Sequence, residues 1–157
     1  MVGDHLLINR LAYRLKEIRR GDVVSFHAPN QRDAVYLKRV IAKGGDRVEF
    51  REDAVFVNGA PLAESYVQHV CRACGERGHS LVVPRGQLYV LGDNRDRSED
   101  SRYWGTVPEE SVVGAPVIVL WSFSYPSNAW LRGTPLALYL NHPLARLRWS
   151  RFMQAVQ

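Results

Sequence analysis

Apolar and polar residues alternate over several short segments in the first half of the chain. The segment from Asp22 to Pro29, DVVSFHAP, follows the turn signal Arg20-Gly21-Asp22 and has the composition of a strand. The segment from Ala34 to Lys43, AVYLKRVIAK, alternates between a face with Val35, Leu37, Arg39 and Ile41 and a face with Tyr36, Lys38 and Val40. A further candidate strand, HLLINR, precedes both. This period of two residues predicts β-strands.

The same kind of pattern continues to about residue 122. RVEFRED and AVFVNGAPL predict a hairpin, with Asn58-Gly59 as a further reversal. SLVVPRGQLYVLGDN contains two strands around Pro84-Arg85-Gly86, and VVGAPVIVLWSF makes another. Short strands with turn signals roughly every ten residues favour a mainly β fold.

The domain organisation that we expect is simple. Residues 1–157 form a single β domain, with a small loop-rich insertion at residues 60–80 that contains both cysteines. Only residues 142–157 have the 3.6-residue period of a helix, with arginines on the other face, so we expect a short C-terminal helical tail.

Composition narrows the class of protein. The 157 residues are 46% hydrophobic and 10% aromatic, which is typical of a globular domain and excludes global disorder. The net charge of +5 permits contact with anionic lipid or nucleic acid, and charge alone does not distinguish them. The apolar run from Ala115 to Trp121 is far shorter than the roughly 20 residues of a membrane-spanning helix.

Lys38 is the first candidate for chemistry. If its strand face is buried, loss of solvation lowers the pKa of the amine, and a neutral lysine can act as the general base of a Ser-Lys dyad. The alternative is a solvent-exposed lysine that blocks pairing at a strand edge. The strand pattern by itself leaves both interpretations open.

The segment from Gly92 to Pro108, GDNRDRSEDSRYWGTVP, is rich in charged and hydroxyl side chains, yet apolar positions flank it. With YLKRVIAKGGD it resembles two conserved segments of the bacterial type I signal peptidases, peptidase family S26. These are membrane-bound serine proteases that remove signal peptides from exported proteins. Lys43-Gly44 replaces the more usual proline-containing approach to Gly45-Asp46. The resemblance covers most of the chain and weakens over residues 60–80 and after Trp121.

The resemblance implies a fold of coiled antiparallel β-sheets and a role for each matching residue. Lys38 would be the general base, and Ser98 would orient its amine. Asp100 and Arg102 would form a supporting ion pair, and Asp93 would be a further polar support of the same loop. The polar segment would then hold a reactive lysine in place rather than form a solvated surface loop.

The nucleophile of the family lies in a Ser-Met-x-Pro-Thr box shortly before a Gly-Asp pair, which Gly3-Asp4 matches here. Only Met1 and Val2 precede that pair. We therefore expect the nucleophile, the N-terminal membrane anchor and part of the oxyanion hole to be missing from this chain. Either the chain starts downstream of them or it is a natural homologue without activity. The resemblance places Ser98 on the orienting side of Lys38, which argues against Ser98 or Ser101 as nucleophile.

The segment HVCRACGERGHS contains Cys71 and Cys74 with His69 and His79 nearby. Two cysteines and two histidines suit a zinc site, but the spacing is cramped and one Cys-x-x-Cys is a weak signal. A disulfide and free thiols are the alternatives, and all three stay open.

These observations lead to three hypotheses. The first is a signal peptidase that acts by a Ser-Lys mechanism, without a cofactor, on signal peptides of preproteins at the extracytoplasmic face of the cell membrane. The second is a self-cleaving repressor protease; the Gly-Asp-Asn-Arg sequence and the lack of a DNA-binding motif argue against it and against a nucleic-acid partner. The third is a non-catalytic homologue that binds peptides or the membrane surface.

Overall fold

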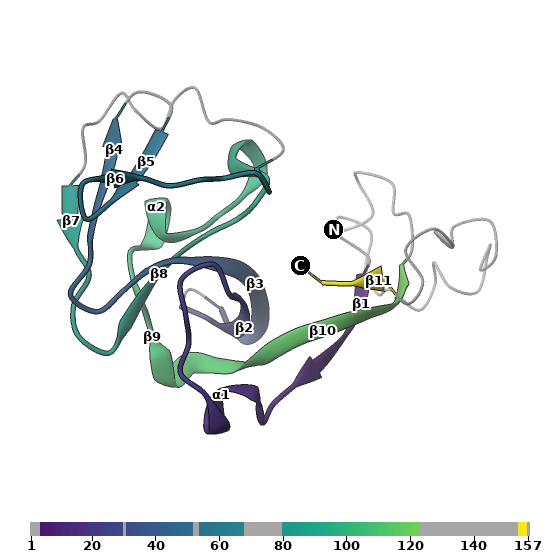
Figure 1. Ribbon diagram of the computed structural model, residues 1–157. Coiled ribbons are helices and arrows are strands. Elements are labelled where there is room, and N and C mark those ends of the chain that lie inside the picture. Colours follow the sequence, from purple (N-terminus) through teal and green to yellow (C-terminus); the bar gives the residue numbers. More distant parts are fainter. Residues whose placement is uncertain (1–3, 30, 52–53, 68–79, 123–153, 157) are drawn as a thin grey trace. The chain divides into compact units, whose positions relative to one another are not determined.

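The computed structural model describes residues 4–29, 31–51, 54–67, 80–122 and 154–156. Most of these residues lie in antiparallel strands, as Figure 1 shows. The mainly β fold predicted from the sequence is therefore confirmed. Cys71, Cys74, His69 and His79 lie outside the described residues, and so does most of the expected insertion and tail.

The chain groups into two compact units. One comprises residues 10–115, and the other comprises residues 1–9 with residues 116–157. One domain can contain more than one compact unit, so the single domain expected over residues 1–157 stays a prediction. All residues of the candidate site that the structure describes lie in the first unit.

The main sheet of the first unit holds the lysine strand at its centre. Its strands are β2 (Val23–Ala28), β3 (Gln31–Lys43), β8 (Gln87–Leu91) and β9 (Val107–Pro108), in the order β2-β3-β8-β9, and the first residues of β10 (Val112–Ser122) pair with β2. Strand β3 pairs with β2 along most of its length, whereas β8 pairs only with Arg39 to Lys43. Among the strands that the structure describes, only β2 thus pairs with the part of β3 before Arg39.

A second sheet has the strand order β6-β5-β4-β7. The predicted hairpin is present as β4 (Arg47–Arg51) and β5 (Ala54–Val57), and β6 (Ala60–Pro61) and β7 (Ser80–Val82) flank it. Between β5 and β6, Asn58 and Gly59 both have positive φ, 53° and 82°, as a two-residue type I′ turn requires. The sequence signal Asn-Gly therefore marks this reversal correctly.

Two hydrophobic clusters lie on opposite faces of β8. Leu88 and Val90 belong to one cluster, whereas Tyr89 and Leu91 belong to the other. The first cluster includes Val24, Phe26 and Val40 with Tyr36 and Trp104 at its margin, and the second cluster packs the main sheet against β4 and β5. Because successive side chains of a strand point to opposite faces, β8 contributes to both clusters, and its residues Leu88 to Leu91 are all buried.

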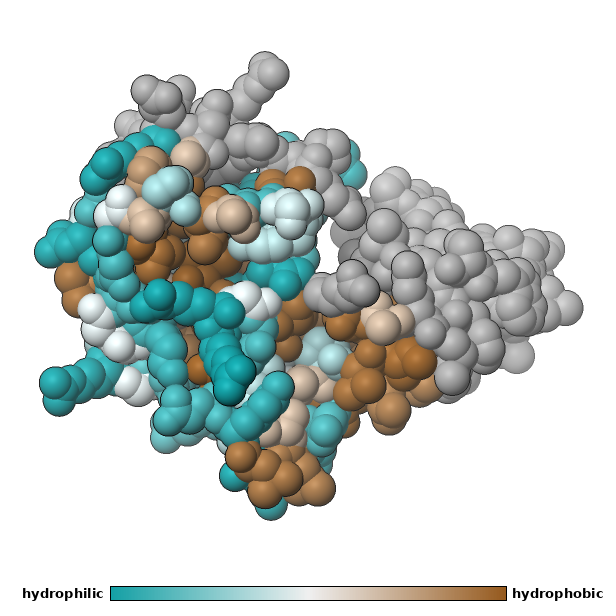
Figure 2. All heavy atoms as spheres, viewed as in Figure 1, coloured by the Kyte–Doolittle hydropathy of each residue, from teal (hydrophilic) through white to brown (hydrophobic). Residues whose placement is uncertain are grey.

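Short helices occupy the connections. Helix α1 (Ala12–Leu15) follows the first strand, and η1 (Arg95–Arg97), α2 (Ser101–Trp104) and η2 (Glu109–Ser111) lie between β8 and β10. Figure 2 shows hydrophobic side chains on the surface at α1, at the bottom of the view, where Leu11 and Leu15 are 58% and 87% exposed.

The second unit contains β1 (Asp4–Asn9), the later part of β10 and β11 (Gln154–Ala155). Strand β11 pairs with β10, so that Ala155 lies opposite Ile118. Gln154 and Ala155 are therefore strand residues, and the helix expected over residues 142–157 does not include them. Pairing with β10 satisfies their backbone groups in place of a helical turn. The remainder of that expected helix, up to residue 153, lies outside the described residues.

Candidate active site

Lys38 and Ser98 are in direct contact, although 60 residues separate them in the chain. The Nζ of Lys38 donates a hydrogen bond of 2.8 Å to the Oγ of Ser98. Lys38 lies on β3 opposite Val24 of β2, and its Nζ is 5.6 Å from the centre of the Tyr36 ring. Ser98 is buried in the segment of residues 92–100 between β8 and α2, which we call the turn. The structure thus places an amine and a hydroxyl together, at the two positions that the family resemblance pairs.

The surroundings of Lys38 disfavour its charged form. Burial lowers the pKa of Lys38 from its ordinary value of 10.5, and Arg102 acts in the same direction, whereas the charges of Asp100 and Glu99 oppose this shift without cancelling it. Loss of solvation acts on the ammonium because fewer water molecules stabilise its charge. A lowered pKa increases the fraction of neutral amine at a given pH, and the neutral amine can accept a proton.

Gly92 forms one wall of this contact. A Cβ atom at Gly92 would lie 2.1 Å from the Oγ of Ser98 and 3.7 Å from the Nζ of Lys38. Any side chain at this position would therefore displace Ser98. The glycine allows the backbone to approach the hydroxyl closely enough for Ser98 to reach the lysine.

Asp100 and Arg102 form an ion pair that stabilises the turn. Asp100 is completely buried, and its two oxygens accept hydrogen bonds of 2.7 and 2.8 Å from the guanidinium of Arg102. Asp100 also caps α2 through the backbone N–H of Arg102 and accepts the backbone N–H of Gly92 at 3.0 Å. One buried carboxylate therefore connects the start of the turn, its end and the helix that follows.

Asp93 binds Arg39, a residue for which the sequence suggested no role. The guanidinium of Arg39 donates to the two carboxylate oxygens of Asp93 at 2.9 and 2.8 Å, and it also donates to the carbonyl of Gly21 at 2.8 Å. Arg39 follows Lys38 directly on β3. This bidentate pair ties the lysine strand to the first residues of the turn.

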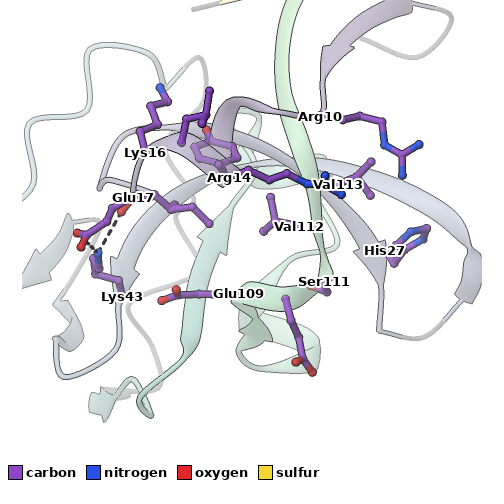
Figure 3. A pocket seen from close by; sticks show the side chains of 14 residues that line it. Arg10, Arg14, Lys16, Glu17, His27, Lys43, Glu109, Ser111, Val112 and Val113 are labelled. Carbon is purple, nitrogen blue, oxygen red and sulfur yellow. Dashed lines mark hydrogen bonds and ion pairs between the residues drawn. The ribbon is translucent and has the colours of Figure 1, made fainter.

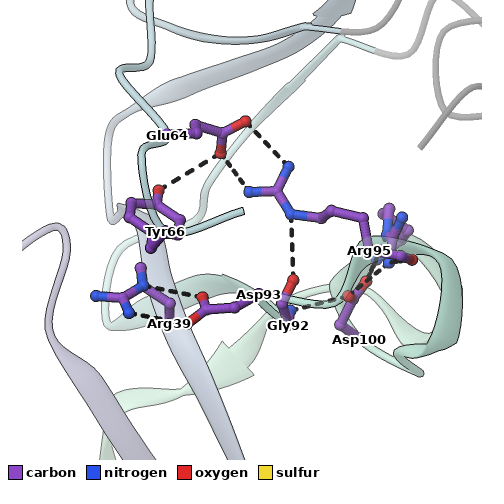
Figure 4. Close-up of polar contacts among 8 residues, drawn as sticks. Arg39, Glu64, Tyr66, Gly92, Asp93, Arg95 and Asp100 are labelled. Carbon is purple, nitrogen blue, oxygen red and sulfur yellow. Dashed lines mark hydrogen bonds and ion pairs between the residues drawn. The ribbon is translucent and has the colours of Figure 1, made fainter. Parts of the chain in front are cut away.

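Two more residues of this network come from the segment around residue 65, which sequence reasoning did not assign to the site. Figure 4 shows Glu64 against the guanidinium of Arg95, and the same guanidinium donates to the carbonyl of Gly92 at 3.2 Å. The hydroxyl of Tyr66 donates to Glu64 at 3.4 Å. The segment from Gly92 to Pro108 holds four acidic residues and three arginines, so no sequence signal indicated that Arg95 would take its carboxylate from outside that segment.

A pocket elsewhere in the same unit does not include the lysine or the serine. Its volume is about 850 Å³, and Figure 3 shows charged residues of both signs around it, among them Arg10, Arg14, Lys43 and Glu109. Among its lining residues, the Nζ of Lys43 donates to the carbonyl of Ile18 at 3.1 Å and lies 3.8 Å from the carboxylate of Glu17. Neither Lys38 nor Ser98 lines this pocket, so the pocket is separate from the Lys38–Ser98 contact.

Comparison with known proteins gives a consistent result. Residues 1–121 match the model of a family described as signal peptidase, peptidase S26. The signal peptidase I of Aquifex aeolicus (strain VF5) is 31% identical over 194 residues, which cover 87% of this chain and 76% of that protein. A probable signal peptidase I-2 of Synechocystis sp. is 39% identical over 126 residues, which cover 76% of this chain and 56% of that protein.

A solved structure agrees with these sequence matches. The crystal structure of a signal peptidase I from Enterococcus faecalis V583 superposes with a TM-score of 0.56 at 35% identity and covers 64% of this chain and 97% of that one. The resemblance found in two sequence segments therefore extends through the fold. The chain belongs to the signal peptidase family, peptidase S26.

Proposed function

We propose that this protein is a signal peptidase I-like serine endopeptidase in which Lys38 is the general base. The observation that carries the proposal is the 2.8 Å contact between the Nζ of Lys38 and the Oγ of Ser98, in surroundings that lower the pKa of the lysine. Membership of the S26 family supplies the reaction class, which is peptide-bond hydrolysis by a serine.

The reaction proceeds by acyl transfer. The nucleophilic serine belongs to the family's Ser-Met-x-Pro-Thr box, which precedes the Gly-Asp pair matched by Gly3-Asp4. Neutral Lys38 takes the proton of that serine hydroxyl while the oxygen attacks the scissile carbonyl. The resulting ammonium then gives the proton to the leaving amine, and water hydrolyses the acyl-enzyme with Lys38 again as base. Through its hydrogen bond, Ser98 holds the Nζ of Lys38 in its orientation during both steps.

The unpaired edge of β3 offers a place for the substrate. Among the described residues, no strand pairs with Val35 to Lys38 on the edge opposite β2, because β8 begins to pair at Arg39. An extended peptide can add to such an edge through backbone hydrogen bonds. A signal peptide bound there would pass directly beside Lys38. Small residues near its cleavage site would allow the close approach that the reaction needs.

Membrane contact is a further part of the proposal. Leu15 is 87% exposed on α1, and Arg10, Arg14 and Lys16 surround it in the sequence with exposed basic side chains. Exposed leucine beside basic residues is typical of surfaces that touch anionic lipid. No helix among the described residues is long and apolar enough to cross a bilayer. We place the catalytic unit at the extracytoplasmic face of the cell membrane.

The test uses a form of the protein in which the Ser-Met-x-Pro-Thr box precedes Gly3, called here the box-containing form. It is incubated with a signal-peptide substrate that has alanine before the scissile bond, and with a matched peptide that has lysine there. We expect cleavage after alanine and a rate at least about 10²-fold lower after lysine. Binding of both peptides without cleavage would reject the peptidase and favour a peptide-binding homologue.

A further inference from the structure

Arg95 occupies the middle of the turn that carries Ser98, and its side chain is only 5% exposed. Its Nε donates to the carbonyl of Gly92 at 3.2 Å, and its own carbonyl accepts a hydrogen bond of 2.7 Å from Arg102. Arg95 therefore holds the turn at two places. A guanidinium this deeply buried needs an anionic partner, because an unpaired buried charge is strongly destabilising.

Glu64 supplies that partner from outside the turn. Its two oxygens accept from Nη1 and Nη2 of Arg95, and the Glu64 side chain is 15% exposed. A bidentate contact of this kind fixes the plane of the guanidinium as well as its position. The orientation of the Arg95 Nε toward Gly92 thus depends on Glu64.

Gly92 transmits this orientation to the reactive pair. Its carbonyl is held by Arg95 and its N–H by Asp100, so both neighbouring peptide groups are fixed. The Cα of Gly92 is packed so closely against Ser98 that a Cβ would lie 2.1 Å from the Oγ. A shift of Gly92 would therefore move the surface against which Ser98 rests while it contacts Lys38.

Tyr66 makes a second contact between the same segment and the site. Its hydroxyl donates to Glu64 at 3.4 Å, and its ring lies 4.1 Å from the guanidinium carbon of Arg39, the residue after Lys38. Burial raises the pKa of Tyr66 to about 12, so the hydroxyl keeps its proton at neutral pH and can donate it to the carboxylate. The segment from Glu64 to Tyr66 thus touches both the turn and the lysine strand.

We propose that Glu64 is a positioning residue for the reaction: through Arg95 and Gly92 it holds Ser98 against Lys38. The segment from Glu64 to Tyr66 would thereby hold the turn that carries Ser98 in place. The inference rests on the proposed function only for its effect on cleavage, because the position of Ser98 and the environment of Lys38 are measurable without substrate.

The test compares Glu64→Gln with a matched control, Glu49→Gln. Both changes remove a carboxylate that pairs with an arginine, but the Glu49–Arg51 pair lies within β4, a strand of the second sheet. The readout is the pKa of Lys38, followed through its ¹³Cε signal in ¹³C-lysine-labelled protein. The chain has only three lysines, Lys16, Lys38 and Lys43, so the signals can be assigned by substitution.

Two effects of Glu64→Gln on Lys38 have opposite signs. Loss of a negative charge near an ammonium would lower the pKa of the lysine further. Loosening of the turn would admit water to the amine and raise its pKa toward 10.5. We expect a rise in Glu64→Gln, a smaller rise in Glu64→Asp, which keeps the charge but shortens the side chain, and no change in Glu49→Gln.

Cleavage by the box-containing form gives the second readout. We expect kcat of Glu64→Gln to fall about 10- to 100-fold with KM changed less than about twofold, because geometry at the reacting atoms is affected rather than peptide binding. Arg95→Gln should have a similar effect, and the double variant should be little worse than either single variant.

An unchanged or lowered pKa of Lys38 in folded Glu64→Gln would overturn the inference, and so would an unchanged kcat. If Glu64→Gln does not fold, Glu64→Asp decides by the same two measurements. A parent protein that cleaves no signal peptide would refute the proposed function alone, since the titration of Lys38 would still decide the role of Glu64.

Discussion

Lys38→Met in the box-containing form is expected to lose cleavage of signal-peptide substrates by roughly 10³-fold or more. Methionine is nearly as long as lysine and fills the space of the lysine methylene groups. It has no amine, so it cannot take the proton of the nucleophile. The hydroxyl of Ser98 loses its partner at the same time. The measurement is the initial rate of cleavage at saturating substrate, with folding checked by circular dichroism.

Lys43→Met is the matched control for this change. Lys43 lies on the same strand, β3, and its Nζ donates to the carbonyl of Ile18 rather than to any residue of the catalytic turn. We expect its cleavage rate to stay within about twofold of the parent rate, because the change lies outside the reacting groups. Full activity of Lys38→Met, or equal losses in the two variants, would show that Lys38 is not the base.

Asp100→Ala is expected to reduce the free energy of unfolding by about 3–5 kcal/mol, because it leaves the guanidinium of Arg102 without its buried partner. Asp100 is 0% exposed, and the Arg102 side chain is 11% exposed, so water can replace little of the lost interaction. The change also removes the N-cap of α2 and the acceptor for the N–H of Gly92. Urea denaturation at constant pH measures the difference.

An exposed ion pair provides the comparison. Glu49→Ala removes the partner of Arg51, whose side chain is 58% exposed, and this should cost at most about 1 kcal/mol. If Asp100→Ala cost no more than Glu49→Ala, the support of the catalytic turn by the Asp100–Arg102 pair would be refuted. Ser98 would then have to be held by its other neighbours.

The strands were predictable because their signals are local. The alternation in Ala34 to Lys43 and the Asn58-Gly59 turn each depend on a few neighbouring residues, and β3 and the type I′ turn follow them. The expectation of a helix at the C-terminus relied on period alone. It was wrong for Gln154 and Ala155, because pairing with a distant strand, β10, overrides a local preference.

The site could be predicted only in part. The contact between Lys38 and Ser98 joins residues far apart in the chain, so strand pattern alone left the state of Lys38 open, and only the family resemblance suggested this partner. Glu64 and Tyr66 were missed because they lie where that resemblance is weakest. Their roles depend on the buried charge of Arg95 and the position of Arg39. Both features arise from contacts between distant parts of the chain, which local sequence patterns do not predict.

The most direct test of the account is the titration of Lys38 in the folded protein by its ¹³Cε chemical shift. The account predicts a pKa below the ordinary 10.5, because burial removes water from the amine. Activity of the box-containing form should then rise with pH through that same pKa, as the neutral base becomes populated. A Lys38 that titrates at or above 10.5, with cleavage indifferent to its ionisation, would contradict the account.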